Sequence, residues 1–445
     1  MTVVAGPFPR TTRRAAPANL ADQLSFAAAV FIVLTYSQGW ILPLFGGGDE
    51  TSDSGLIRTL YLPAYVAAVG LMALSPGATA NALIRQPTLV LLIGVAAASF
   101  FWSVSPDQTE RRVFALVFTT LGGVVLAARY SWARLAEVLA TSFAILAAAS
   151  LFTGLFVPSI GRMDSIFPGA WRGLWPEKNA LGGNMALGTA ICIAAALLNP
   201  RRARLWWGAA LLTSLLLVMS TSKTSVVSLS AGVGAMCLVA LARRGPAGAV
   251  AATWVAVAGL AAVGVAVFFA SDVVLGLLGK DATLTGRTQI WAAVMRQIQL
   301  RPALGYGYAA IWDEDLGSWG PLAWIIHDAG FRPHHSHNSW LEQWLAMGYV
   351  GLAAWIAFFG QTLAANVVAL YREKGAYLAL PYFVVYAITS LSESIAVQYN
   401  DMRWTIFVAL AVKLALPDPK PVRPSGPPRL VSWGAAESGP TRAKV

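Results

Sequence analysis

Long apolar stretches recur along almost the whole chain and are separated by short polar or basic loops. Each stretch runs for roughly 15–25 residues, the length of helix that crosses the roughly 30 Å hydrocarbon core of a bilayer. Outer-membrane strands would instead alternate apolar and polar residues over about ten positions. Only 12% of the residues are charged, whereas a soluble domain has about 25%. The sequence therefore predicts an all-α polytopic membrane protein.

Twelve membrane spans are expected. They are placed at Leu24–Leu44, Thr59–Leu74, Pro87–Val104, Val113–Ala128, Val138–Val157, Ala180–Leu198, Leu205–Met219, Ser225–Ala242, Ala249–Leu277, Trp344–Tyr371, Tyr377–Leu391 and Trp404–Leu416. Residues 24–416 would then form the membrane domain, preceded by an N-terminal tail over 1–23. The tail over 417–445 is rich in proline, glycine and serine, which predicts disorder. An even number of spans places both tails on the same side.

Clusters of basic residues indicate which side that is. They lie at Arg201, Arg202 and Arg204, at Arg243 and Arg244, and at Arg372 and Lys374. Loops rich in lysine and arginine stay in the cytoplasm, so both tails are predicted to be cytoplasmic. The net charge of +11 then faces anionic lipid head groups, and no nucleic acid partner is expected. Two longer loops, 158–179 and 279–339, fall on the outer side of the membrane.

All the histidines of the chain lie in the second outer loop, at His327, His334, His335 and His337. Histidine is the side chain that titrates near neutral pH without help from its surroundings. The run from Ser339 to Glu342 fits a capping box, with Ser339 as the N-cap and Glu342 at the third helical position. His337 and Asn338 would then precede a helix N-terminus, which favours an anion and a neutral imidazole that can accept a proton.

The same loop contains three further features. Apolar residues between Gln289 and Gln299 follow one helical face, which predicts a short amphipathic helix lying on the bilayer surface, with Arg287 at its start and Pro302 after its end. Two glycines in Leu304–Tyr308 suit a turn whose backbone comes close to another segment. The acidic run Asp313–Asp315 offers oxygen ligands for a divalent metal, but a solvated loop is the favoured interpretation and no metal is predicted.

The first outer loop and the helix that follows it carry further cations. They are Arg162, Arg172 and Lys178, with Asn179 beside the last, and Lys223 before a later span. Lysines at helix ends usually extend toward the interface, yet several cations at one face would make an electropositive pocket. Near the end of the chain, further polar groups are expected on that face at Glu393, Asn400, Asp401 and Arg403.

Taken in order, these segments resemble the O-antigen ligase and polymerase superfamily of bacterial envelope glycan enzymes, and most closely its exopolysaccharide polymerase branch. The matching segments are Lys178–Gly182, Ser222–Ser225, Gly286–Trp291, Pro302–Tyr308, His335–Asn338 and Gly348–Gly351. No single segment is specific to the family. Their order and their placement in the periplasmic loops make the set more specific than any one of them.

The resemblance implies a fold like that of the C-type glycosyltransferases. It implies a glycan donor carried on undecaprenyl diphosphate, a glycan acceptor, and transfer to an acceptor hydroxyl with inversion and without metal or cofactor. Arg287 would grip the diphosphate, with Arg162 or Arg172 as a second clamp, and His337 would orient or deprotonate the acceptor. The remaining candidate substrate-binding residues are Lys178, Asn179, Lys223, His335 and Asn338.

Three functions remain open. The first is polymerisation of exopolysaccharide repeat units. The second is ligation of a finished glycan to lipid A core or another acceptor, which shares the donor chemistry. The third, a glycolipid flippase, would carry polar groups at mid-membrane in broken helices, whereas the ionisable residues here gather in the periplasmic loops. A separate flippase and a chain-length regulator are candidate protein partners, besides the lipid bilayer.

Overall fold

The structure is a computed structural model that describes residues 20–46, 54–164, 167–269, 287–312, 317, 320–416 and 418. Within these ranges the secondary structure consists of helices, most of them α-helices packed in a bundle. One isolated bridge pairs Arg162 with Trp171. Nearly all of both predicted tails, and the acidic run Asp313–Asp315, lie outside the described residues. Over these residues the protein is all-α, as predicted.

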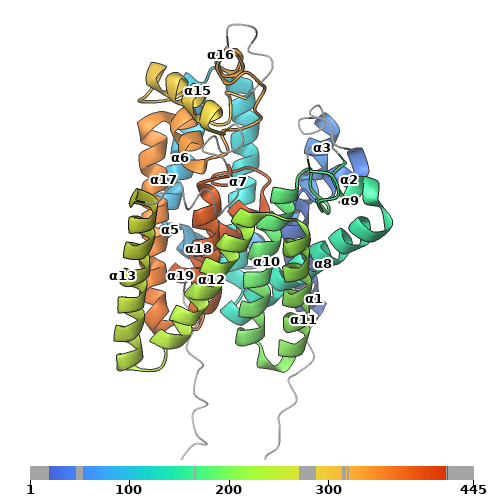
Figure 1. Ribbon diagram of the computed structural model, residues 1–445, viewed down its shortest axis with the longest axis vertical. Coiled ribbons are helices and arrows are strands. Elements are labelled where there is room, and N and C mark those ends of the chain that lie inside the picture. Colours follow the sequence, from blue (N-terminus) through green and yellow to red (C-terminus); the bar gives the residue numbers. More distant parts are fainter. Residues whose placement is uncertain are drawn as a thin grey trace, which may run out of the picture.

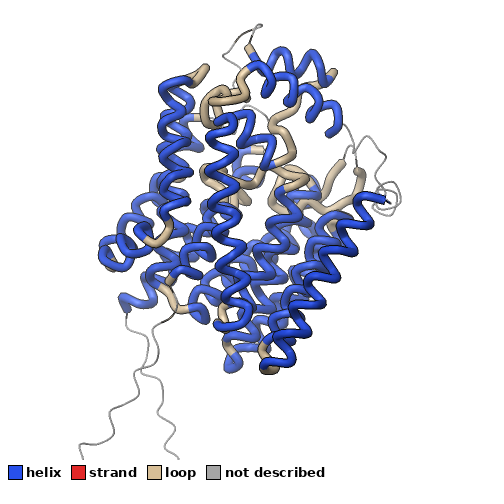
Figure 2. The backbone as a smooth tube through the Cα atoms, turned by 90° about the vertical axis from the view of Figure 1, so that its left-hand side faces the viewer, coloured by secondary structure: helices blue, strands red, loops and turns tan. Residues whose placement is uncertain are grey.

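The helices follow one another through the chain without a strand between them in the described ranges (Figures 1 and 2). They are α1 Leu20–Tyr36, α2 Ile41–Phe45, α3 Gly55–Leu60, α4 Leu62–Ala73, α5 Pro76–Ile84, α6 Pro87–Ala98, η2 Ser99–Trp102, α7 Pro106–Arg129, α8 Trp132–Phe156, α9 Pro158–Gly161, α10 Lys178–Leu198, η3 Pro200–Arg202, α11 Ala203–Met219, α12 Lys223–Ala242, α13 Pro246–Phe269, α15 Arg287–Leu300, α16 Pro321–Ala329, α17 Ser339–Arg372, α18 Ala376–Ser390 and α19 Met402–Ala415. Each predicted span overlaps one of these helices or a consecutive pair.

Not every predicted span is long enough to cross a bilayer. Among the described residues, 7 helices are long and apolar enough, or up to 8 if α5 and α6, which are bent by 86° relative to each other, form one broken span. Other apolar helices, such as α1 and α18, are shorter. The polytopic membrane character is thus confirmed, while the number of twelve spans stays a prediction.

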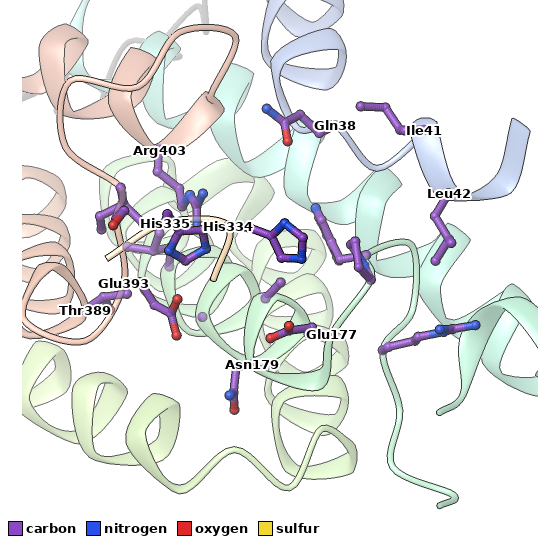
Figure 3. Close-up of a pocket in the computed structure, with 18 of the residues that line it drawn as sticks. Gln38, Ile41, Leu42, Glu177, Asn179, His334, His335, Thr389, Glu393 and Arg403 are labelled. Atoms are coloured by element: carbon purple, nitrogen blue, oxygen red, sulfur yellow. The ribbon is translucent and has the colours of Figure 1, made fainter. Parts of the chain in front are cut away.

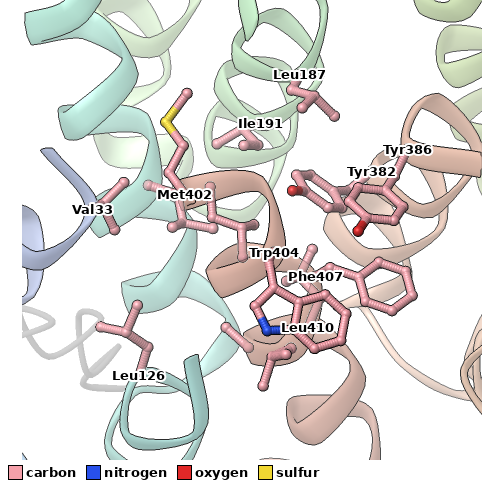
Figure 4. Close-up of a cluster of buried hydrophobic side chains, with 14 of the residues drawn as sticks. Val33, Leu126, Leu187, Ile191, Tyr382, Tyr386, Met402, Trp404, Phe407 and Leu410 are labelled. Atoms are coloured by element: carbon pink, nitrogen blue, oxygen red, sulfur yellow. The ribbon is translucent and has the colours of Figure 1, made fainter. Parts of the chain in front are cut away.

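The core of the bundle surrounds α19. The rings of Trp404 and Phe407 on this helix are at most 1% exposed, and Phe407 stacks on Tyr386 of α18 with 4.4 Å between ring centroids (Figure 4). Helices at the periphery instead expose large apolar side chains, such as Leu211 on α11 and Trp254 on α13. An apolar exterior around a tightly packed aromatic interior is what a bundle surrounded by lipid requires.

The two ends of the bundle differ in the loops they carry. Helices α15 and α16 lie at one end, here called the histidine end (Figure 1). At the opposite end, Arg202 pairs with Glu137 at 3.3 Å, and the Trp132 indole donates to Glu373 at 3.1 Å. Through these two contacts, the loops that follow α10 and α17 both pack against the start of α8, which follows α7. The basic loops at 201–204 and 372–374 therefore share an end, as the positive-inside assignment requires; which end faces the cytoplasm stays a prediction.

The turn at Pro302–Tyr308 docks onto a kink in α17. Gly348 interrupts the helix with φ +63°, and the next N–H, that of Tyr349, donates to Pro302 O at 2.8 Å. A Cβ on Gly348 would lie 2.2 Å from a carbonyl oxygen of this turn, and one on Gly305 would lie 2.5 Å from Leu345 O. Both positions need glycine because another backbone occupies that space. The expectation of a close backbone approach is confirmed.

The predicted amphipathic helix exists as α15, but its apolar face does not lie on lipid. Ile290, Val294 and Ile298 are at most 3% exposed and pack in one cluster with residues of the 302–312 segment, α16 and α17, among them Ile325 and Leu345. The surface-helix interpretation is therefore wrong. Amphipathic periodicity shows that one face is buried, but it does not show whether protein or lipid buries it.

Candidate functional site

The N-terminus of α17 is capped by Asn338 rather than by Ser339. The Asn338 Oδ1 accepts the backbone N–H groups of Trp340 at 2.9 Å and of Leu341 at 3.2 Å. Asparagine and serine are comparable N-caps, so local preference did not decide between them. The predicted capping box is therefore wrong by one residue, and Asn338, predicted to bind substrate, has a structural role at the helix start.

Ser339 and Glu342 are used instead to join two loops. The Ser339 hydroxyl donates to Glu393 O at 2.8 Å and accepts the N–H of Ile395 at 2.9 Å. The Glu342 carboxylate accepts the N–H of Ser336 at 2.9 Å. The histidine run before α17 is thereby fixed against the segment between α18 and α19, although more than 50 residues separate them in the chain.

A chain of three ionisable groups crosses this junction. The His337 Nδ1 lies 3.2 Å from Glu393 Oε2, and the Arg287 guanidinium lies 2.7 Å from Glu393 Oε1. His337 has φ +51°, a conformation that costs a non-glycine residue energy and that occurs often at functional sites. Its own N–H donates to His335 Nδ1 at 3.1 Å, and the two rings lie 4.0 Å apart. The predicted catalytic pair, Arg287 and His337, is thus joined through Glu393.

The surroundings fix the charge of two of these groups. Burial raises the pKa of Glu393, but the hydrogen bond from His337 and the charge of Arg287 outweigh it and lower that pKa to about 2. Burial, with a smaller contribution from His337, lowers the pKa of His335 to about 3. At neutral pH Glu393 is an anion and His335 is neutral. Since His335 Nδ1 accepts a hydrogen bond, its proton resides on Nε2.

Beside this chain opens a cavity of about 520 Å³, here called the histidine cavity (Figure 3). Its polar lining residues are Gln38, Arg172, Glu177, Asn179, His334, His335, Thr389, Glu393, Ser394 and Arg403. His335, Glu393 and Arg403 lie together on one side, and the apolar Ile41 and Leu42 lie on another. The lining contains two arginines and two glutamates, so its charges balance.

The two candidate clamp arginines differ in their relation to this cavity. Arg172 lines it, while its Nε donates to Ile160 O at 2.8 Å. Arg162 is not among the lining residues; its Nε donates to Gly154 O at 2.8 Å and its guanidinium lies 5.3 Å from the ring of Trp171. Both arginines therefore stabilise their own loop, and Arg172 alone of the two also reaches the cavity.

The remaining candidates fall into two groups. Asn179 and His335 line the histidine cavity. Lys178 does not; its ammonium lies 3.6 Å from the ring centroid of Phe167, and Lys223 is exposed at the first turn of α12. The family segments that contain these two lysines nevertheless meet, because a Cβ on Gly182 would lie 2.7 Å from the Ser222 side chain.

Several lining residues had not been assigned a role. Glu393 and Arg403 are ionisable residues in an otherwise apolar part of the chain, and the sequence predicts them on the same face as the histidines. The Arg403 Nε donates to Asp401 at 3.0 Å, which fixes the guanidinium beside His335 (Figure 3). Gln38 carried no such signal, because it is a single uncharged amide inside the predicted span Leu24–Leu44.

His335, His337 and Glu393 are also candidate metal ligands. One ligand atom each from His335, His337 and Glu393 lie within 4.8 Å of one another, and such side chains bind transition metals. Arg287, however, already pairs with one oxygen of Glu393 and places a cation beside the cluster, which opposes a dication. The absence of a metal stays a prediction that chelation can test.

Comparisons with known proteins agree with the family resemblance. Residues 208–356 match the family model described as O-Antigen ligase, a segment that contains Arg287 and His337. The exopolysaccharide production protein ExoQ of Rhizobium meliloti (strain 1021) is 30% identical over 285 residues, which are 60% of this chain and 63% of that protein. The chain thus spans less than two thirds of this relative's length. The resemblance to the O-antigen ligase and polymerase superfamily, nearest its exopolysaccharide branch, is confirmed.

Proposed function

We propose that this chain is a membrane glycosyltransferase that lengthens an exopolysaccharide from repeat units carried on undecaprenyl diphosphate. The reaction would take place at the histidine end, on the periplasmic side of the bacterial inner membrane. One observation carries the proposal: a histidine held by an anionic carboxylate stands beside a cavity that two arginines line. The match to the ligase family and to a protein named for exopolysaccharide production supports it.

The arginines receive the diphosphate of the donor. Arg172 and Arg403 line the histidine cavity, and a guanidinium binds phosphate oxygens through two parallel N–H groups. Arg287 pairs with Glu393, but its five N–H donors allow it to bind a carboxylate and a phosphate at the same time. Neutralising the charge that develops on the departing diphosphate is the largest catalytic contribution expected here.

His337 receives the proton of the acceptor. Its Nδ1–H donates to Glu393, which leaves the Nε2 lone pair free to accept the hydroxyl proton. The acceptor oxygen forms a bond to the anomeric carbon on the face opposite the diphosphate, and the bond from that carbon to the phosphate oxygen breaks with both electrons leaving on the diphosphate. The anomeric centre is inverted, and Glu393 stabilises the imidazolium that forms.

The intermediates that a deletion strain accumulates distinguish polymerase from ligase. Loss of a polymerase leaves single repeat units on the lipid carrier, whereas loss of a ligase leaves long lipid-linked chains. We expect single repeats. Ligation is the second candidate function because the matched family is described as O-Antigen ligase. Accumulation of long lipid-linked chains would establish ligation in place of our proposal.

The sidedness of the site is tested by cysteine labelling. Phe331 is 43% exposed at the histidine end, and Arg204 is exposed at the opposite end. In a background in which Cys192 and Cys237 are replaced, a membrane-impermeant maleimide should label Phe331→Cys in cells with a permeabilised outer membrane and should not label Arg204→Cys. The reverse pattern would place the histidine cavity in the cytoplasm and reject the proposed reaction.

A further inference from the structure

A second cavity of about 490 Å³ adjoins the histidine cavity, and the two share Gln38 and Ile41 in their walls. We call it the tyrosine cavity. Its lining comes from the segment between α1 and α2, the start of α2, α3, α4, α7 and the segment before α19. The lining residues are Gln38, Ile41, Arg58, Tyr61, Leu62, Tyr65, Gln108, Glu110, Arg111, Arg112, Phe114, Ala115, Gln398, Tyr399 and Asn400. None of these residues had been assigned a functional role from the sequence.

The lining combines aromatic rings with amides. Three tyrosines and the phenylalanine offer ring faces, and four amide side chains offer donors and acceptors. A sugar ring presents apolar C–H faces and a rim of hydroxyls, and aromatic side chains with a polar end suit both. A prenyl chain would instead need an apolar lining, which the amides and the three arginines of this cavity do not provide.

Gln108 contributes an amide to the edge of the tyrosine cavity. The residue is 7% exposed, so protein covers most of its side chain. Amide groups in such positions are normally satisfied by protein, water or ligand. Because Gln108 borders the tyrosine cavity, a saccharide hydroxyl bound there can hydrogen-bond to its amide.

Gln38, which both cavities share, is held by Asn400 of the tyrosine cavity, and both residues have a positive φ. Gln38 and Asn400 have φ +58° and φ +54°, and the Gln38 amide donates to Asn400 O at 3.0 Å. The Asn400 Oδ1 in turn accepts the Tyr65 hydroxyl at 2.7 Å. Non-glycine residues in this conformation are kept where the surrounding structure requires them. Gln38 and Asn400 therefore hold the place where a ligand in one cavity would meet a ligand in the other.

We propose that the tyrosine cavity binds the acceptor glycan and presents its terminal hydroxyl past Gln38 to the donor in the histidine cavity. This inference rests on the proposed transfer function. A glycosyl transfer needs two saccharides to meet at one point, and two cavities that share a wall supply that arrangement without moving a helix. The diphosphate-linked saccharide occupies the cavity with histidine and carboxylate, and the acceptor occupies the cavity with tyrosine and amide.

The test uses oligosaccharides of one to three repeat units, prepared by partial acid hydrolysis of the polysaccharide that the same cells make. Their binding to the full-length protein in lipid nanodiscs is measured by calorimetry. Gln108→Leu, which removes the amide, and Arg58→Ala, at an exposed position in the lining, should each weaken the affinity by roughly tenfold. Arg204→Ala, an exposed arginine at the opposite end, is the matched control and should bind as the unmodified protein does.

Kinetics and lipid binding complete the test. In transfer assays the two lining variants should raise KM for the acceptor oligosaccharide while kcat is kept, and the affinity for undecaprenyl diphosphate without sugar should stay unchanged. Unaltered oligosaccharide affinity in both variants would overturn the inference. A parallel loss of affinity for undecaprenyl diphosphate would also overturn it, because the cavity would then hold the lipid.

Failure of the inference differs from failure of the proposed function. If the chain does not transfer glycans, the unmodified protein forms no product in any assay. If only the acceptor site is misplaced, the unmodified protein forms product and both lining variants keep its acceptor KM. Thermal unfolding of each variant identifies any loss of fold, and the exposed Arg58 position keeps the test valid if Gln108→Leu is unstable.

Discussion

Replacing Glu393 with glutamine removes the charge that joins the proposed base to the proposed diphosphate-binding arginine. The carboxylate lies 3.2 Å from His337 Nδ1 and 2.7 Å from Arg287. Glutamine keeps the size of the side chain, but it cannot stabilise an imidazolium by charge, and its NH2 group facing Nδ1 would select the wrong tautomer. A comparable loss in other His–carboxylate pairs lowers kcat by about 10²–10⁴-fold, which is about 3–5 kcal/mol of barrier. We expect Glu393→Gln to fall in that range.

The pH dependence follows from the same contacts. The pKa of Glu393 is about 2, below its ordinary value of 4.5. The stabilising charge is therefore fully present above about pH 4.5 and is lost only as the pH falls through about 2. In the working range of the enzyme Glu393 stays ionised, so an acid limb in the pH–rate profile above pH 4.5 belongs to another group. Glu393→Gln should lower the transfer rate on the plateau of the pH–rate profile. The shape of the profile above pH 4.5 should not change, because residue 393 does not titrate there.

The assay measures polymer formed by purified protein in proteoliposomes, with kcat and the donor KM determined separately. Arg287 is 9% exposed, and a buried charge that loses its partner can cost about 3–5 kcal/mol of stability, so thermal unfolding is recorded for each variant. Glu393→Asp keeps the charge and is the matched control for the amide. A folded Glu393→Gln protein with unmodified kcat would refute the assigned role of the carboxylate.

The remaining predictions concern substitutions at three other positions and the effect of a chelator. His337→Ala should abolish transfer at an unchanged protein level, and polymer of normal length in that variant would remove the residue from the mechanism. Arg287→Lys should also fail in the transfer assay because a lysine cannot bind two phosphate oxygens in parallel; retained activity would contradict bidentate binding. Treatment with a chelator should leave activity unchanged, whereas activity lost and then restored by added metal would assign an ion to the histidine cluster or to Asp313–Asp315. Gly348→Ala should lower the thermal unfolding midpoint, since its Cβ would lie 2.2 Å from Ala303 O at φ +63° and such strain costs roughly 1–3 kcal/mol; an unchanged midpoint would show that the kink in α17 can relax.

Local patterns were enough to place the long apolar helices, but they did not predict the short helices α5 and α16. Hydrophobic length and periodicity depend on neighbouring residues in the chain, so the helices that begin at Lys178 and at Arg287 were expected close to where they lie. The same patterns could not tell what covers a face, and α15 is buried by protein rather than lipid. Nor could they choose between Asn338 and Ser339 as the helix cap. The Ser339 hydroxyl hydrogen-bonds to the backbone of Glu393 and Ile395 instead, and these residues are distant in the sequence.

The site itself was only partly predictable. Arg287 and His337 were identified because ionisable residues are conspicuous in an apolar chain. Their connection through Glu393 depends on contacts across 56 and 106 residues of sequence, which no local pattern encodes. Gln38 and Gln108 were missed for a related reason: an amide becomes notable only when the fold places it in the lining of a cavity.

The central claim is that the histidine cavity transfers glycan from a lipid diphosphate with inversion. Purified protein supplied with a synthetic undecaprenyl-diphosphate oligosaccharide of defined anomeric configuration tests it directly, with the product analysed by mass spectrometry and NMR. The account predicts lipid-linked chains that grow by whole repeat units, each joined by a linkage of the opposite anomeric configuration to the donor bond. Absence of longer chains, or new linkages that retain the donor configuration, would contradict it.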